Sequence, residues 1–184
     1  MCFESKASVQ RGEDLALDYL DALFSYAFGL TRNRTDAEDL VQETFLRSMT
    51  AMNRLRADSN VKSWLFTVLR NTWFNQLRKR RTAQEVDGVD IDQFRTESQG
   101  FDNPEAALEG KVDREQVRDA IRRLPLEFRE VILLREYGDL SYQEIAGVLN
   151  CPIGTVMSRL GRARSKLREF LSAANSPVLR KAES

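Results

Sequence analysis

The segment from 141 to 160 holds the residue types that a helix-turn-helix needs for binding duplex DNA. Two helices that cross steeply need a small residue at the crossing, and the tight turn between them needs a residue that tolerates a left-handed backbone. Ala146 and Asn150 meet these needs, and Val156 supplies an inward-facing apolar anchor in the second helix. The spacing therefore predicts a helix-turn-helix. The alternative is an ordinary helical hairpin with a basic, solvated face.

The second of these helices should carry polar and basic side chains on its outer face. Such side chains can contact phosphates and base edges in a major groove, and the N-terminus of the helix can itself take a phosphate. The expected DNA-contacting residues of this part of the chain are Tyr142, Gly154, Thr155, Ser158, Arg159, Arg162, Arg164 and Lys166.

Aromatic and basic residues alternate along the segment from 64 to 81. Aromatic faces stack on unpaired bases and a basic track follows the phosphates, so the combination suits single-stranded or melting DNA better than an intact duplex. Trp64 shares the apolar face of the expected helix and could equally be a core residue. The residues concerned are Trp64, Phe66, Trp73 and Phe74, interleaved with Arg70, Asn71, Asn75, Arg78, Lys79, Arg80 and Arg81.

An acidic stretch between Thr35 and Leu46 contains no basic residue. Its polar side chains are Asp36, Glu38, Asp39, Gln42 and Glu43. Such a charge run could be a plain solvated helix face. Paired carboxylates can also bind Mg²⁺, but no glycine-rich phosphate loop accompanies these, so we expect no enzymatic metal site.

The charges of the chain cancel in sum but are segregated in sequence. The 184 residues include 28 basic and 28 acidic side chains, which gives a formal net charge of zero. The segment from 62 to 81 carries no acid, the segment from 85 to 109 carries one base, and every charge from 159 to 168 is basic. The pattern indicates two basic surfaces separated by an acidic connector.

Several classes of site are disfavoured by composition. There are two cysteines, Cys2 and Cys151, and no histidine, so a tetrahedral zinc site lacks ligands and the usual nucleophilic triads lack a base. No apolar run approaches the roughly 20 residues that span a bilayer, and no signal pattern opens the sequence. We expect a cytoplasmic, non-enzymatic protein with no cofactor, no metal and no membrane insertion.

Apolar periodicity predicts an all-α protein of two small helical domains joined by a flexible acidic linker. The expected division is a first domain at 14–82, a linker at 83–103, a second domain at 104–173 and a tail at 174–184. The expected helices lie at about 14–30, 35–52, 61–80, 104–124 and 126–137, then from 141 to the turn at Asn150, and at 154–173.

Three local signals predict where helices begin and end. Thr35 with Glu38, and Ser141 with Glu144, both have the form of a capping box. Gly138 is expected just after the end of its helix.

Taken in order, these segments resemble the extracytoplasmic-function sigma factors of bacterial RNA polymerase. Segment 37–45 (AEDLVQETF) is similar to region 2.2, and segment 64–72 (WLFTVLRNT) to region 2.3 running into 2.4. Segments 124–131 (LPLEFREV), 140–146 (LSYQEIA) and 151–156 (CPIGTV) are similar to region 4. The resemblance spans about 14–171, with the motifs in the expected order.

The resemblance implies that region 2 reads the −10 promoter element and region 4 the −35 element. The loop at 55–62 and the start of the next helix would hold a base flipped from the melted −10 element, and Asn71 would lie near these bases. The implied −10 residues are Arg56, Asp58, Ser59, Asn60, Lys62, Trp64, Arg70, Asn71, Asn75, Arg78, Lys79, Arg80 and Arg81. Met157 stands where many members of the family carry arginine. The −35 sequence that such members recognise is therefore not transferred to this protein.

The resemblance also implies protein partners. The acidic helix would dock on the coiled-coil clamp of the polymerase β′ subunit through Asp36, Asp39, Gln42 and Glu43. The β flap of core polymerase and an anti-sigma factor are further implied partners, and the linker would thread toward the RNA exit path.

Two other functions were weighed against this one. A stand-alone helix-turn-helix regulator would bind a duplex operator, but it leaves the first helical unit without a role. A recombinase would need an activated nucleophile, and nothing in the sequence supplies its environment.

Overall fold

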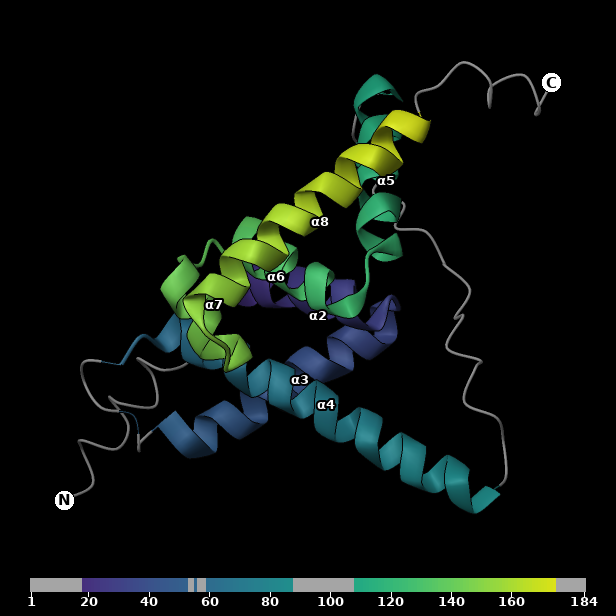
Figure 1. Cartoon of the computed structure of the whole chain (residues 1–184). Coiled ribbons are helices and arrows are strands. Elements are labelled where there is room, and N and C mark those ends of the chain that lie inside the picture. Colours follow the sequence, from purple (N-terminus) through teal and green to yellow (C-terminus); the bar gives the residue numbers. More distant parts are fainter. Residues whose placement is uncertain (1–17, 53–54, 56–58, 88–107, 175–184) are drawn as a thin grey trace.

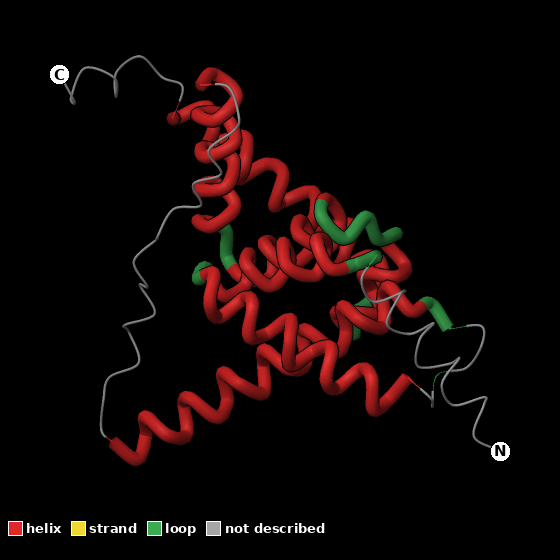
Figure 2. Tube along the Cα trace, turned by 180° about the vertical axis from the view of Figure 1, so that it is seen from behind, coloured by secondary structure: helices red, strands yellow, loops and turns green. Residues whose placement is uncertain are grey.

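The computed structural model describes residues 18–52, 55, 59–87 and 108–174, and all regular structure within these ranges is α-helical. Figure 1 shows the helices in chain order, and Figure 2 shows the same arrangement from behind. The all-α prediction is therefore confirmed. Residues 88–103 of the expected linker lie outside the described residues.

The first unit consists of α2 (Leu20–Thr31), α3 (Arg34–Met52) and α4 (Val61–Asp87). Helix α2 packs on α3 and α4, and α3 packs on α4. Fully buried side chains from all three helices fill the space between them, among them Leu23, Leu40, Leu65 and Leu69. This apolar core fixes the outward direction of the polar faces of α3 and α4.

The helix ends of the first unit differ from the predicted ones. Helix α2 begins at Leu20, and the preceding residues 18–19 form a turn. Helix α3 is capped by Asn33, whose side-chain oxygen accepts from the Asp36 N–H at 3.1 Å, so the capping box expected at Thr35 is wrong. Helix α4 continues to Asp87, seven residues past its predicted end, because no glycine or proline interrupts it before Gly88.

The second unit consists of α5 (Leu108–Arg123), α6 (Leu126–Glu136), α7 (Tyr142–Leu149) and α8 (Ile153–Ala174). Helix α8 packs along α5, α6 and α7 (Figure 1). Its buried residues Val156, Leu160 and Ala163 lie at helical spacing, so one stripe of α8 faces the core and the rest stays outside.

The turn between α7 and α8 is the predicted helix-turn-helix. Asn150 has a left-handed backbone with φ of 50°, and Val156 is fully buried as the inward anchor. Ser141 and Glu144 form the predicted capping box. Gly138 follows Tyr137, the C-cap residue of α6, as predicted, while the left-handed residue of this turn is Asp139 (φ 45°). Gly138 is needed instead for space, since an added Cβ would lie 2.6 Å from the Leu134 carbonyl oxygen and 3.1 Å from Phe66.

The two units pack against each other, an arrangement that the sequence left open. Helix α6 lies on α2, and α7 lies on α4, so that buried residues of both units form one continuous core. Gly29 of α2 lies at a close contact between the units, because a Cβ at this position would lie 2.7 Å from Cδ2 of Leu133. The Leu133 side chain fills the space that a larger residue at position 29 would need.

Replacing Ser141 with alanine should destabilise the second unit by about 1 kcal/mol, because the N–H of Glu144 loses its cap. Chemical denaturation followed by circular dichroism measures this. Ser165→Ala, at an exposed position inside α8, is the matched control and should be neutral or slightly stabilising. Equal stability of the two variants would show that the capping box contributes nothing.

Candidate nucleic-acid interface

Helix α8 exposes a polar face opposite its buried stripe. Gly154, Ser158 and Arg162 follow one another at four-residue spacing and are all exposed. Met157 lies beside them with 56% of its surface accessible. Because α8 follows the tight turn at Asn150, its first turns project from the helix-turn-helix with this face free, which is the geometry of a helix that enters a major groove.

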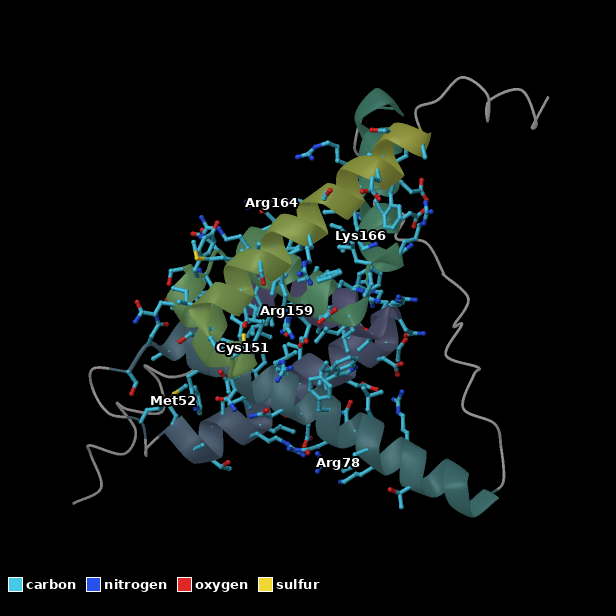
Figure 3. All side chains as sticks on the ribbon, in the orientation of Figure 1. Met52, Arg78, Cys151, Arg159, Arg164 and Lys166 are labelled. Atoms are coloured by element: carbon cyan, nitrogen blue, oxygen red, sulfur yellow. The ribbon has the colours of Figure 1, made fainter. Side chains whose placement is uncertain are left out.

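The arginines on the flanks of this face make loose ion pairs with α6. A guanidinium nitrogen of Arg159 lies 3.5 Å from a carboxylate oxygen of Glu127, and one of Arg164 lies 3.5 Å from Glu136. Both glutamates are about half-exposed. Thr155 and Lys166 are half-buried, as is Tyr142, whose ring lies beneath the Arg135 guanidinium at 5.7 Å. Figure 3 shows Arg159, Arg164 and Lys166 along α8. Such weak, solvated pairs leave the guanidinium groups able to exchange to phosphate.

Helix α4 carries a second polar row, far along its length. Asn71, Asn75 and Arg78 are exposed at spacings of four and three residues, which places them on one face. Lys79 and Arg80 are also exposed, and Arg80 reaches Asp36 of α3 at 3.4 Å. Arg78 is labelled in Figure 3, on the part of α4 that extends away from α8. The side chain of Arg81 lies outside the described ones.

The first half of α4 is turned toward the second unit rather than toward solvent. Trp64 is half-buried and packs against the apolar core, so part of its side chain serves packing, as the core alternative predicts. Arg70 donates from Nε to Glu130 at 2.6 Å and stacks on Phe74 with 4.6 Å to the ring centre. Burial lowers the pKa of Arg70, but the hydrogen bond and charge of Glu130 outweigh it and raise the pKa overall.

The loop before α4 also meets the second unit. Asn60 caps α4, accepting from the N–H of Ser63 at 3.0 Å, and its side-chain amide donates to Glu144 of α7. A groove between α4 and α7 includes Ser59 and Trp64. Lys62 lies 5.9 Å from the Tyr19 ring centre. Arg56 and Asp58 lie outside the described residues.

Glu144 should give the protein a specific acid sensitivity. Hydrogen bonds to Ser141 lower its pKa, and Asn60 and Lys62 add to the effect. Ionised Glu144 therefore stabilises the folded protein. This stabilisation is complete above the ordinary carboxyl pKa of about 4.3 and is lost as the pH falls through the lowered pKa of Glu144. Glu144→Gln should therefore lose less unfolding free energy than the parent as the pH falls below about 4.3. Parallel pH–denaturation series measure this, and identical slopes would contradict it.

Helix α3 presents the predicted acidic surface together with an apolar extension. Asp39 and Gln42 are exposed, and Glu43 is half-buried and pairs with Arg47 at 2.6 Å. Leu46 and Met49 continue the same face with 62% and 47% of their surfaces accessible. This apolar extension was not predicted, although Asp39, Gln42 and Leu46 stand at the spacing of one helix face.

The comparisons with known proteins match both units. The first unit matches the Sigma-70 region 2 family over residues 15–83, and the second matches the Sigma-70 region 4 family over residues 114–167. An extracytoplasmic-function sigma factor named EcfG, from Rhodopseudomonas palustris, is 35% identical over 86% of this chain and 83% of its own length. The chain belongs to the extracytoplasmic-function sigma factors. The sigma-E factor of Escherichia coli K12 is 34% identical over 86% of this chain and 88% of its own.

Solved structures of sigma factors share the fold. The sigma factor RpoE of Bartonella quintana, in complex with the anti-sigma factor NepR, superimposes with a TM-score of 0.73 at 36% identity. That match covers 87% of this chain and 96% of the other. CnrH in complex with the cytosolic domain of CnrY gives a TM-score of 0.67 at 26% identity, covering 94% and 96%. This sigma factor therefore directs promoter-specific transcription initiation by RNA polymerase.

Two observations bear on other chemistry of this sigma factor. Within the described ranges there is no group of three acidic, histidine or cysteine side chains placed to hold a metal ion. Within the same ranges, no helix is both long and apolar enough to cross a membrane.

Proposed function

We propose that the sigma factor divides promoter recognition between the exposed rows of α4 and α8. The observation that carries this is that both rows are exposed, while the buried apolar residues of α4 and α8 lie on other sides of these helices. Asn71, Asn75 and Arg78 would contact the melted −10 strand, where stacking and phosphate contacts combine. Ser158 and Arg162 would contact the −35 duplex from the major groove.

The remaining sequence-predicted contacts join these two sets. On the −10 side they are Arg56, Asp58, Ser59, Asn60, Lys62, Trp64, Arg70, Lys79, Arg80 and Arg81, and on the −35 side Tyr142, Gly154, Thr155, Arg159, Arg164 and Lys166. Arg70 contributes only when the units separate, because it pairs with Glu130 of the other unit. Residues 14–82 would act as the −10 and polymerase-binding domain, and 104–173 as the −35 domain.

The face of α3 is the proposed docking surface for the β′ clamp of core polymerase. Asp36, Asp39, Gln42 and Glu43 would meet basic residues, and the exposed Leu46 and Met49 would add apolar contact beside them. Charges at the rim and an apolar centre are the usual composition of a protein interface. Region 4 would contact the β flap, and the protein would act in the cytoplasm by binding, without a catalytic step.

An anti-sigma factor is a further proposed partner. The similar sigma factor RpoE was solved in complex with the anti-sigma factor NepR, and the similar protein CnrH in complex with the cytosolic domain of CnrY. Similarity over most of both chains supports the same class of partner for this protein.

Run-off transcription with purified core polymerase tests the proposal. On a library of genomic fragments, transcripts should appear only when core enzyme and this protein are both present. Absence of any promoter-dependent transcript would contradict the sigma function. Tight, sequence-specific duplex binding without core would instead favour a stand-alone helix-turn-helix regulator.

A further inference from the structure

Helix α8 begins with an exposed apolar pair that lies outside the core. Ile153 is the first residue of the helix and Met157 follows one turn later, with 48% and 56% of their surfaces accessible. Within the described part of the chain, neither side chain is among those that pack on the apolar core. Because residues four positions apart lie on the same side of a helix, the two form one apolar strip on the outside of the helix-turn-helix.

This apolar strip runs along one flank of the exposed polar row of α8. Met157 precedes Ser158 of that row by one residue, and Arg159 follows Ser158 by one. Each step along the chain turns about 100° around the helix axis, so Met157 and Arg159 lie on opposite flanks of the row. The outer face of α8 therefore has an apolar border on one side and a basic border on the other.

The helix surface around Met157 is bare on its outer side. Its outward neighbours, three residues before and four residues after, are Gly154 and Gly161, and both are exposed. A Cβ added at either glycine would meet no atom within 4 Å. The side chain of Met157 thus projects beside uncovered backbone, and a surface that approaches α8 can come close to it.

The chemistry of a thioether limits what it can recognise in a major groove. Methionine has no N–H or O–H donor for a phosphate or a guanine, and it leaves a polar base edge without water when it is placed against one. Thymine is the base that presents an apolar group in this groove, its C5-methyl group. The unbranched, polarisable side chain of methionine can adapt its shape to such a group.

We propose that Met157 is a specificity-determining residue of the −35 contact and that it reads the 5-methyl group of a thymine in this element. The inference rests on the proposed function, because it takes the polar row of α8 to lie in the −35 major groove. Ser158 and Arg162 then contact polar base edges beside the thymine, and Ile153 keeps water from the methyl contact. A protein partner suits the strip less well, since a stable interface needs roughly 800 Å² from each side and the residues around this strip are polar and basic.

Replacing thymine with uracil tests this contact, because uracil lacks only the methyl group and keeps the hydrogen-bonding edge of thymine. A promoter is taken from the run-off transcription assay, and its −35 element is located by block substitution. Each thymine on either strand is then replaced singly, and fluorescence anisotropy gives the affinity of the holoenzyme for the labelled duplex. We expect uracil at one position to weaken binding by about fourfold, the effect of exposing one methyl-sized group. At that position 5-bromouracil, whose bromine has nearly the volume of a methyl group, should restore the affinity.

Variants at position 157 assign the contact to its side chain. Met157→Gln keeps the length of the side chain but ends it in an amide, and should bind the thymine and uracil duplexes with nearly equal affinity. Met157→Leu stays apolar and should retain most of the difference. Val117→Ala, at an exposed apolar position of α5, is the control and should retain all of it. Circular dichroism verifies that the helix content of each variant is unchanged.

A −35 element without thymine, or uracil substitutions that change nothing at any position, would overturn the proposal. An unchanged thymine preference in Met157→Gln, or a loss in Met157→Leu as large as in Met157→Gln, would overturn the assignment to an apolar side chain at position 157. Weaker binding of Met157→Gln to core polymerase would place Met157 in a protein interface instead. Run-off transcription separates these results from the proposed function, because transcription that still depends on the −35 element leaves that function standing.

Discussion

Replacing Asp39 and Glu43 together with lysine should weaken the binding of the sigma factor to core polymerase by about 100-fold, because like charges brought together at an interface cost several kcal/mol. Both residues lie on the outer side of α3, four residues apart, while the inner side of the helix is buried. Fold stability should change little, since neither carboxylate is in the core. Fluorescence anisotropy with labelled sigma factor and purified core enzyme measures the affinity.

Helix α5 offers a matched control for this charge reversal. Glu115 and Asp119 are also exposed acids four residues apart, and Asp119 makes a local ion pair with Arg122 as Glu43 does with Arg47. Their double replacement by lysine should leave core affinity nearly unchanged. Equal weakening by both pairs would show a general effect of net charge and not a docking surface on α3.

Replacing Arg159 and Arg162 with alanine should reduce promoter-dependent transcription by about 100-fold at limiting holoenzyme, since each good arginine contact to a base is worth about 1–3 kcal/mol. Arg162 is exposed on the free face of α8, and Arg159 is held near that face by a weak pair with Glu127. Affinity for core polymerase should be unaffected, because α3 is unchanged. Run-off transcription and core binding, measured side by side, separate the two effects.

The exposed Arg168, further along α8, serves as the control for lost positive charge. Arg168→Ala should reduce transcription far less than the double variant. Parallel loss of core binding and promoter use in the Arg159 and Arg162 variant would contradict a role in DNA recognition.

Local chemistry made the helix-turn-helix predictable from sequence. The capping box at Ser141, the left-handed turn at Asn150 and the buried Val156 each depend on residues within a few positions of one another. The exposure of Leu46 and Met49 on α3 was harder to predict. The two successive apolar residues Phe45 and Leu46 leave the position of the buried stripe ambiguous by one step.

Contacts between the two regions could not be predicted, because they join residues far apart in sequence. Arg70 was expected as a solvent-facing DNA contact, and nothing near it indicates that Glu130, sixty residues later, covers it. Gly29 reads as an ordinary helical glycine until Leu133 is placed against it. The relative orientation of the two helical units is set by such long-range packing and not by local propensity.

Site-specific photo-cross-linking shows directly which promoter element each of the helices α4 and α8 contacts. A photoreactive amino acid placed at Asn75 or at Ser158 is assembled into holoenzyme on a promoter obtained from the run-off transcription assay. We expect position 75 to cross-link to the single strand of the −10 element and position 158 to the −35 duplex. Cross-links from both positions to one element, or from neither to promoter DNA, would contradict the division of recognition between α4 and α8.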